Sequence, residues 1–165
     1  MKKYELTAEF IEKWGKKLFR IKALISFGSV EAGELGGYVE KEDNLAQDGD
    51  AWVYGNARVY DDAWVYGDAW VYGNAWVCGN ADYLLIGRIG SRFSFTTFFK
   101  NKDKGITVSC GCFLGTIAEF RAKVTDTHGN NKHAKMYNLA ADMAELQILG
   151  EEHFDKLNTN KSEPF

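Results

Sequence analysis

The chain has 165 residues, with 20 lysines and arginines against 23 aspartates and glutamates and a formal net charge of −3. This length allows one domain, or one compact domain with a small appendage, and a real hydrophobic core. The weak and evenly spread charge argues against a footprint for duplex nucleic acid.

The N-terminal segment carries charges where a signal peptide needs an apolar run, and no stretch approaches the roughly 18 apolar residues of a membrane span. The cysteines Cys78, Cys110 and Cys112 are an odd number without the spacing of a disulfide framework, which fits a reducing compartment. We therefore expect a soluble, cytoplasmic protein without membrane partners.

Residues 1–36 are expected to form strands that cap one end of the fold. The segment 18–24 alternates between apolar and polar residues after a Gly-Lys-Lys turn, which predicts strands between residues 4 and 39.

Residues 51–80 are five consecutive six-residue units, AWVYGN, ARVYDD, AWVYGD, AWVYGN and AWVCGN. Such a short fixed period predicts a solenoid, and each unit ends in residues that tolerate the positive φ of a sharp corner. The repeat resembles the left-handed β-helix of hexapeptide-repeat proteins, in which three sides complete a coil. We therefore predict, for residues 37–90, a mainly β fold with a left-handed parallel β-helix of about three coils.

The alanine and valine of each unit lie two residues apart, so they share one strand face, which we expect to be the interior. Residues 18 apart then stack, which places Trp52 over Trp70, Tyr54 over Tyr72, Arg58 beside Trp76 and Trp64 over Asp82.

The resulting aromatic ladder on an outer face is too apolar to remain in water without a reason. It is a surface for self-assembly, since hexapeptide β-helices commonly form trimers, or a face on which a ligand stacks, or a surface covered by the C-terminal segment. The candidate ligand-binding or oligomer-interface residues are Trp52, Tyr54, Arg58, Trp64, Tyr66, Trp70, Tyr72 and Trp76.

Residues 91–150 are expected to form a small α+β appendage, a hairpin followed by two helices. The strands 92–99 and 106–110 flank a polar turn. Thr116 and Glu119 have capping-box spacing for a helix ending near Gly129, and a second helix continues to Gly150. Residues 151–165 are predicted to be a polar, frayed tail.

Segments 18–24, 33–39 and 44–50, together with the repeats, resemble a broad family of bacterial and phage hexapeptide-repeat proteins of largely unassigned function. The segment 109–120, which contains Cys-Gly-Cys-Phe, and the Thr-His-Gly segment at 127–129 look like a module of phage and prophage proteins. The resemblance implies a phage origin and supplies no reaction.

Many hexapeptide-repeat proteins are acyltransferases that use a histidine beside a coil, but His128, His133 and His153 all lie outside the repeats. We therefore expect no catalytic residue and no cofactor. A zinc site formed by Cys110, Cys112, His128 and His133 is an alternative, although the spacing is not that of a recognised finger and buried thiols are the commoner outcome.

Three functions remain. The first is a non-catalytic oligomeric binding protein of phage origin, which sequesters a nucleotide-like small molecule, or otherwise blocks a host defence system, in the host cytoplasm. The second is a structural trimer that contacts a host protein and binds no small ligand. The third is an acyltransferase.

Overall fold

The computed structural model describes residues 1–159. The elements are β1 (Tyr4–Lys13), β2 (Lys16–Ala23), β3 (Leu35–Val39), η1 (Glu42–Asn44), β4 (Trp52–Val53), β5 (Arg58–Val59), β6 (Trp70–Val71), β7 (Trp76–Val77), η2 (Asn80–Asp82), β8 (Tyr83–Ile89), β9 (Ser94–Lys100), β10 (Ile106–Cys110), β11 (Phe113–Thr116), α1 (Ile117–His128), α2 (Lys132–Leu149) and α3 (Glu151–Thr159). No helix within this range combines the length and the hydropathy needed to cross a lipid bilayer.

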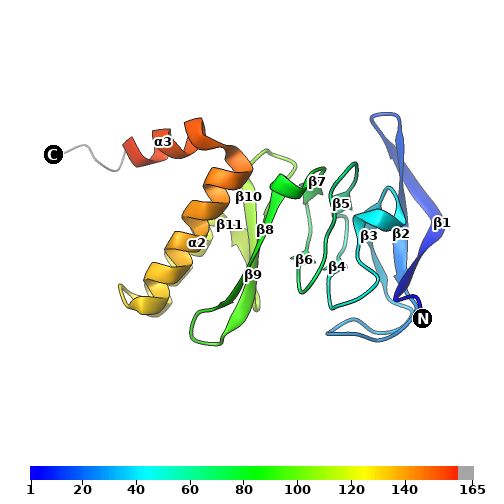
Figure 1. Cartoon of the computed structure of the whole chain (residues 1–165), viewed down its shortest axis with the longest axis horizontal. Helices are drawn as coiled ribbons and strands as arrows, with labels where there is room; N and C mark the ends of the chain where they lie inside the picture. The colour runs from blue at the N-terminus through cyan, green and yellow to red at the C-terminus, as the bar shows by residue number, and fades with distance from the viewer. Residues whose placement is uncertain (160–165) are drawn as a thin grey trace.

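The described strands form three sheets; along the long axis of the molecule the five-stranded and two-stranded sheets overlap at the repeats, and the four-stranded sheet follows them (Figure 1). A five-stranded mixed sheet has the order β1-β2-β3-β5-β7, a two-stranded sheet pairs β4 with β6, and a four-stranded antiparallel sheet has the order β11-β10-β9-β8. The repeat strands lie between the N-terminal hairpin and the four-stranded sheet, and the helices lie at the far end of the molecule.

The prediction of a left-handed parallel β-helix is wrong, and the chain has an α/β fold with mostly β content. The repeats form strands of only two residues, and the unit that contains Val65 is paired through an isolated bridge to Leu45. Two of these short strands, β5 and β7, continue the antiparallel sheet of β1, β2 and β3. The longer flanking strands thus satisfy the hydrogen bonds of the repeat edge, so the short repeats build no regular solenoid.

The register predicted within the repeats is confirmed at most positions. Trp52 pairs with Trp70 and Arg58 pairs with Trp76, both in parallel. Trp64 and Asp82 lie outside the paired repeat strands, so their stacking stays a prediction. The Trp64 amide donates to the Asn80 side chain, because the 3-10 turn η2 begins there and ends the repeat.

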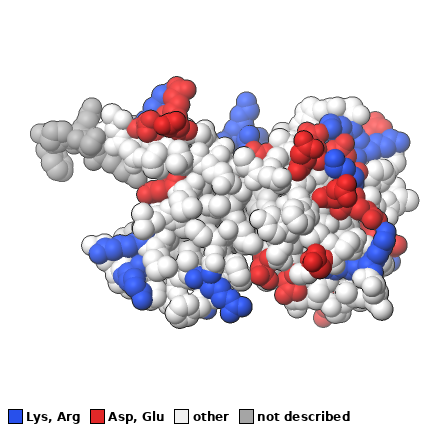
Figure 2. Space-filling view, in the orientation of Figure 1, with Lys and Arg blue, Asp and Glu red and all other residues white. Residues whose placement is uncertain are grey.

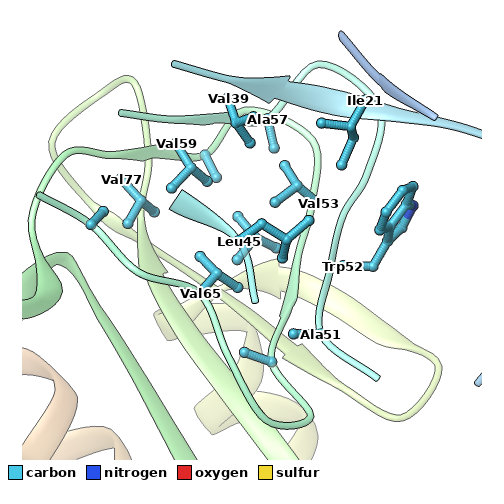
Figure 3. Packing of buried hydrophobic residues seen from close by; sticks show 14 of the residues in the cluster. Ile21, Val39, Leu45, Ala51, Trp52, Val53, Ala57, Val59, Val65 and Val77 are labelled. Carbon is cyan, nitrogen blue, oxygen red and sulfur yellow. The ribbon is translucent and has the colours of Figure 1, made fainter. Parts of the chain in front are cut away.

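The predicted interior is confirmed, since the alanine and valine of every repeat are fully buried. Figure 3 shows Val53, Val59, Val65 and Val77 pointing toward one another around Leu45. Strand β3 packs closely against this core at Gly36. A side chain there would clash, since a Cβ at Gly36 would lie 2.7 Å from the Trp52 ring. Burial of these apolar side chains is the main source of stability in this half of the molecule.

The N-terminal strands, the C-terminal hairpin and both C-terminal helices are confirmed. Strands β9 and β10 pair in antiparallel order, and the Thr116 hydroxyl and the Glu119 amide form the N-cap hydrogen bond of α1. The four-stranded sheet joins two cores, because Phe99 packs with the repeats and Phe98 packs with the helices. Residues 151–159 of the predicted frayed tail form helix α3, and residues 160–165 lie outside the described range.

Candidate functional site

The structure does not gather the eight predicted site residues on one surface. Trp52 lies in the core, fully buried, with its ring edge-on to Phe27 at 5.3 Å and to Tyr4 at 6.1 Å between ring centroids. Strand β1 and the segment between β2 and β3 therefore cover it. Trp52 has no exposed surface to offer a ligand or a second copy of the chain.

Tyr54, Trp70 and Tyr72 form a half-buried aromatic cluster. The rings of Tyr54 and Tyr72 stack with centroids 4.2 Å apart and an interplanar angle of 5°, and Trp70 meets Tyr54 edge-on at 6.0 Å. Burial, and then the neighbouring Tyr54 hydroxyl, raise the pKa of Tyr72, so it remains a neutral phenol at physiological pH. Because these rings pack against one another, the ring faces in these contacts are not free to stack on a ligand.

Arg58 and Trp76 belong to a row of alternating cations and rings across the five-stranded sheet. Arg20 lies 4.5 Å from the centroid of its sheet neighbour Tyr38, and Arg58 lies 5.4 Å from that of Trp76. The exposed ring of Trp14 packs edge-on against Trp76 at 4.9 Å. The Nε and Nη1 atoms of Arg58 are buried and unpartnered within the described residues, so this part of the guanidinium packs against aromatic surface.

Trp64 and Tyr66 are the predicted site residues with the most exposed rings. Both side chains are 48% exposed, and their rings stack with centroids 4.6 Å apart. The shallow hollow beside Trp64 is lined by the acidic residues Glu42 and Asp43. Its charge would repel an anion, so this face fits an aromatic contact better than a nucleotide site.

A pocket whose role in ligand binding the sequence did not indicate lies where the β8–β9 turn, the end of β10, α1 and α2 meet. Its volume is about 350 Å³. The lining residues are Ser91, Arg92, Ser94, Cys110, Gly111, Cys112, Phe113, Phe120, Lys123, Val124, Thr127, His128 and Tyr137. Phe120 packs against both Phe113 and Tyr137 at 5.7 Å between ring centroids, so three aromatic side chains form one wall.

The pocket lining has basic side chains and no acidic ones among the described residues. Arg92 and Lys123 are basic residues of this lining. Burial, and then the neighbouring Cys110 thiol, raise the pKa of Tyr137 to about 12, so its hydroxyl stays protonated. His128 stacks on Tyr137 with ring centroids 5.8 Å apart. The pocket therefore combines cations, hydroxyl groups and ring surface.

Three of the four residues of the alternative zinc site line this same pocket: Cys110, Cys112 and His128. The fourth, His133, does not belong to this lining, and its ring lies 5.5 Å from the His128 ring between centroids. Within residues 1–159, no group of three or more potential ligand side chains is close enough to hold a metal ion. The sulfur of Cys110 instead accepts a hydrogen bond from the Thr96 hydroxyl at 3.2 Å.

A second pocket of about 340 Å³ lies on the opposite face of the four-stranded sheet and has the opposite charge. Asp50, Asp68, Trp70 and Phe95 contribute to its lining. The ammonium group of the buried Lys3 interacts electrostatically with Asp50 and partly offsets the negative charge. The pocket near Arg92 is therefore the stronger candidate for an anionic ligand.

Part of this candidate site could have been inferred from the hairpin alone. Thr96 pairs with Cys110, so the antiparallel register brings the residues just before β9 next to the residues just after β10. The alternative zinc site already grouped Cys110, Cys112 and His128, but no sequence signal places Tyr137 there, because its position depends on how α2 packs on the sheet. In comparisons with known proteins, the chain matches no family model and no curated protein.

Proposed function

We propose that the protein binds, without catalysis, a flat anionic small molecule of the nucleotide class in the pocket lined by Arg92, Lys123 and Tyr137. The observation that carries this proposal is the charge of the lining, which contains two basic side chains and no carboxylate among the described residues. A cavity that concentrates one sign of charge raises the local concentration of ligands of the opposite sign.

The geometry supports one subsite for the phosphate of such a ligand and another for its planar base. The guanidinium of Arg92 can donate two parallel hydrogen bonds to a phosphate, and Lys123 adds a mobile point charge. The ring of Phe113 offers an apolar face for a planar base. A volume of about 350 Å³ lies at the small end of ligand pockets, so a mononucleotide fits better than a dinucleotide.

The neighbours of the Cys110 thiol support binding rather than covalent catalysis. A catalytic cysteine needs a base within hydrogen-bond reach that can take its proton. Cys110 accepts a hydrogen bond from the Thr96 hydroxyl, and its thiol also interacts with the neutral phenol of Tyr137. Neither hydroxyl group can deprotonate a thiol at neutral pH.

The cellular setting is part of the proposal. Cys78, Cys110 and Cys112 are free thiols, which supports the cytoplasm as the location. The phage origin and the action against a host defence system remain predictions from the family resemblance.

Calorimetric titration of the wild-type protein and matched variants with mononucleotides and cyclic mononucleotides tests the proposal. We expect Arg92→Ala to weaken binding at least about tenfold, since it removes charged hydrogen bonds to phosphate. Arg88→Ala is the matched control, because Arg88 is an exposed arginine of the same β8–β9 segment outside the pocket lining. Absence of binding to wild type, or equal weakening by both substitutions, would refute the proposal.

A further inference from the structure

Helix α2 carries an uncovered row of large apolar side chains. Met136, Leu139, Met143 and Leu146 are 36%, 64%, 53% and 44% exposed. They recur at spacings of three and four residues, the pattern of a helix seam that packs against another helix. The opposite face of α2, which includes Ala141 and Ala144, is already buried against the rest of the fold. The helix is therefore apolar on two sides.

The charges at the two ends of this row differ in sign. Lys132 and Lys135 lie in the first turns of α2 and are exposed, and that first turn contains no acidic residue. Glu151 and Glu152 follow the end of α2 and open α3, where they are also exposed. Figure 2 shows basic residues gathered where α2 begins and acidic residues where α3 begins.

Within one chain, the position of these lysines is unfavourable. The N-terminus of a helix carries a partial positive charge, so Lys132 and Lys135 are repelled by the end of the helix on which they lie. An acidic group from outside the helix would remove this penalty. The two glutamates of the same chain cannot supply it, because they lie at the other end of α2.

We propose that this face binds a second copy of the chain, with the two α2 helices packed antiparallel about a two-fold axis. The axis would pass between Leu139 and Met143, so that the apolar row of each copy covers the row of the other. The same operation brings Lys132 of each copy near Glu151 of the other. A parallel pair would instead place lysines beside lysines, so the charges select the antiparallel arrangement.

Sedimentation velocity of the full chain across micromolar concentrations tests this interface. We expect a reversible dimer with a dissociation constant on the order of micromolar, because each copy contributes only four half-exposed side chains. The variant with both Leu139→Glu and Met143→Glu should be a monomer with an unchanged circular dichroism spectrum. Leu114→Glu is the matched control, since Leu114 is an apolar side chain on β11 with 52% exposure, and it should leave the dimer intact.

Charge exchange tests the direction of pairing. A variant with Lys132→Glu and Lys135→Glu should dimerise at least tenfold more weakly than wild type, and mixing it with a Glu151→Lys, Glu152→Lys variant should form a mixed dimer. Tighter self-association of the Lys132→Glu, Lys135→Glu variant than of wild type would contradict antiparallel pairing. A monomeric wild type would overturn the proposal. A trimer whose mass is unchanged by the Leu139 and Met143 substitutions would also overturn it and would point to the repeat faces.

Discussion

Trp52 and Trp64 occupy the same position in nearly identical repeats, yet their replacement should have very different effects on stability. Trp52 is fully buried, whereas the Trp64 side chain is 48% exposed. Replacing a fully buried tryptophan with alanine removes its packing and leaves a cavity, which costs about 3 to 5 kcal/mol of unfolding free energy. Trp64→Ala removes mainly a stacked contact with Tyr66, worth about 1 kcal/mol.

The assay is urea unfolding followed by far-ultraviolet circular dichroism, which does not depend on tryptophan fluorescence. Trp52→Phe serves as a third variant, since the phenyl ring refills much of the site and the lost indole N–H has no hydrogen-bond partner within the described residues. We expect this change to cost about 1 to 2 kcal/mol. Equal losses of stability for Trp52→Ala and Trp64→Ala would refute the buried position of Trp52.

Two further substitutions probe the packing of the helices and the end of the repeat. Gly90→Ala should destabilise the protein by more than about 2 kcal/mol in the same unfolding assay, because its Cβ would lie 1.8 Å from the Tyr137 hydroxyl and φ is +79°; a loss below about 0.5 kcal/mol would contradict this packing. Burial alone would raise the pKa of Asp82, but hydrogen bonds from Cys78 and the charge of Lys100 outweigh it and hold the pKa below its ordinary value. A lowered folded-state pKa gives stability that is present above the unfolded pKa and is lost as pH falls through the folded pKa. Unfolding free energies measured against pH should therefore show Asp82→Asn less stable than wild type at pH 7, and this difference in free energy should vanish below about pH 4. A difference that does not change with pH would contradict a stabilising role for the Asp82 carboxylate.

The repeats allowed their local register to be predicted but not the fold. The period of six placed Trp52 over Trp70 because alternation along a strand is a local property. The way in which the short strands join longer ones is not local. Strand β5 pairs with β3 on one side and with β7 on the other, so the hairpin of β1 and β2 becomes part of the same sheet. Nothing in the hexapeptide pattern indicates this pairing.

The candidate site was less predictable than the elements that build it. The capping box of α1 and the hairpin of β9 and β10 were readable from short segments. The sequence pattern could not show that Trp52 is covered by Tyr4 and Phe27, because both residues come from segments distant in the chain. For the same reason, the presence of His128 and Cys112 in one pocket lining depends on the packing of α1 against the sheet.

The proposed ligand site is tested most directly by the amide resonances of ¹⁵N-labelled wild-type protein during titration with adenosine monophosphate. Binding in the pocket should shift the resonances of residues 91–94 and 110–113, together with those near Lys123 and His128, and should leave those of Trp64 and Tyr66 unchanged. Shifts confined to the repeats would place the ligand on the aromatic faces. Either that result or a spectrum that does not change at saturating ligand would contradict the pocket as the binding site.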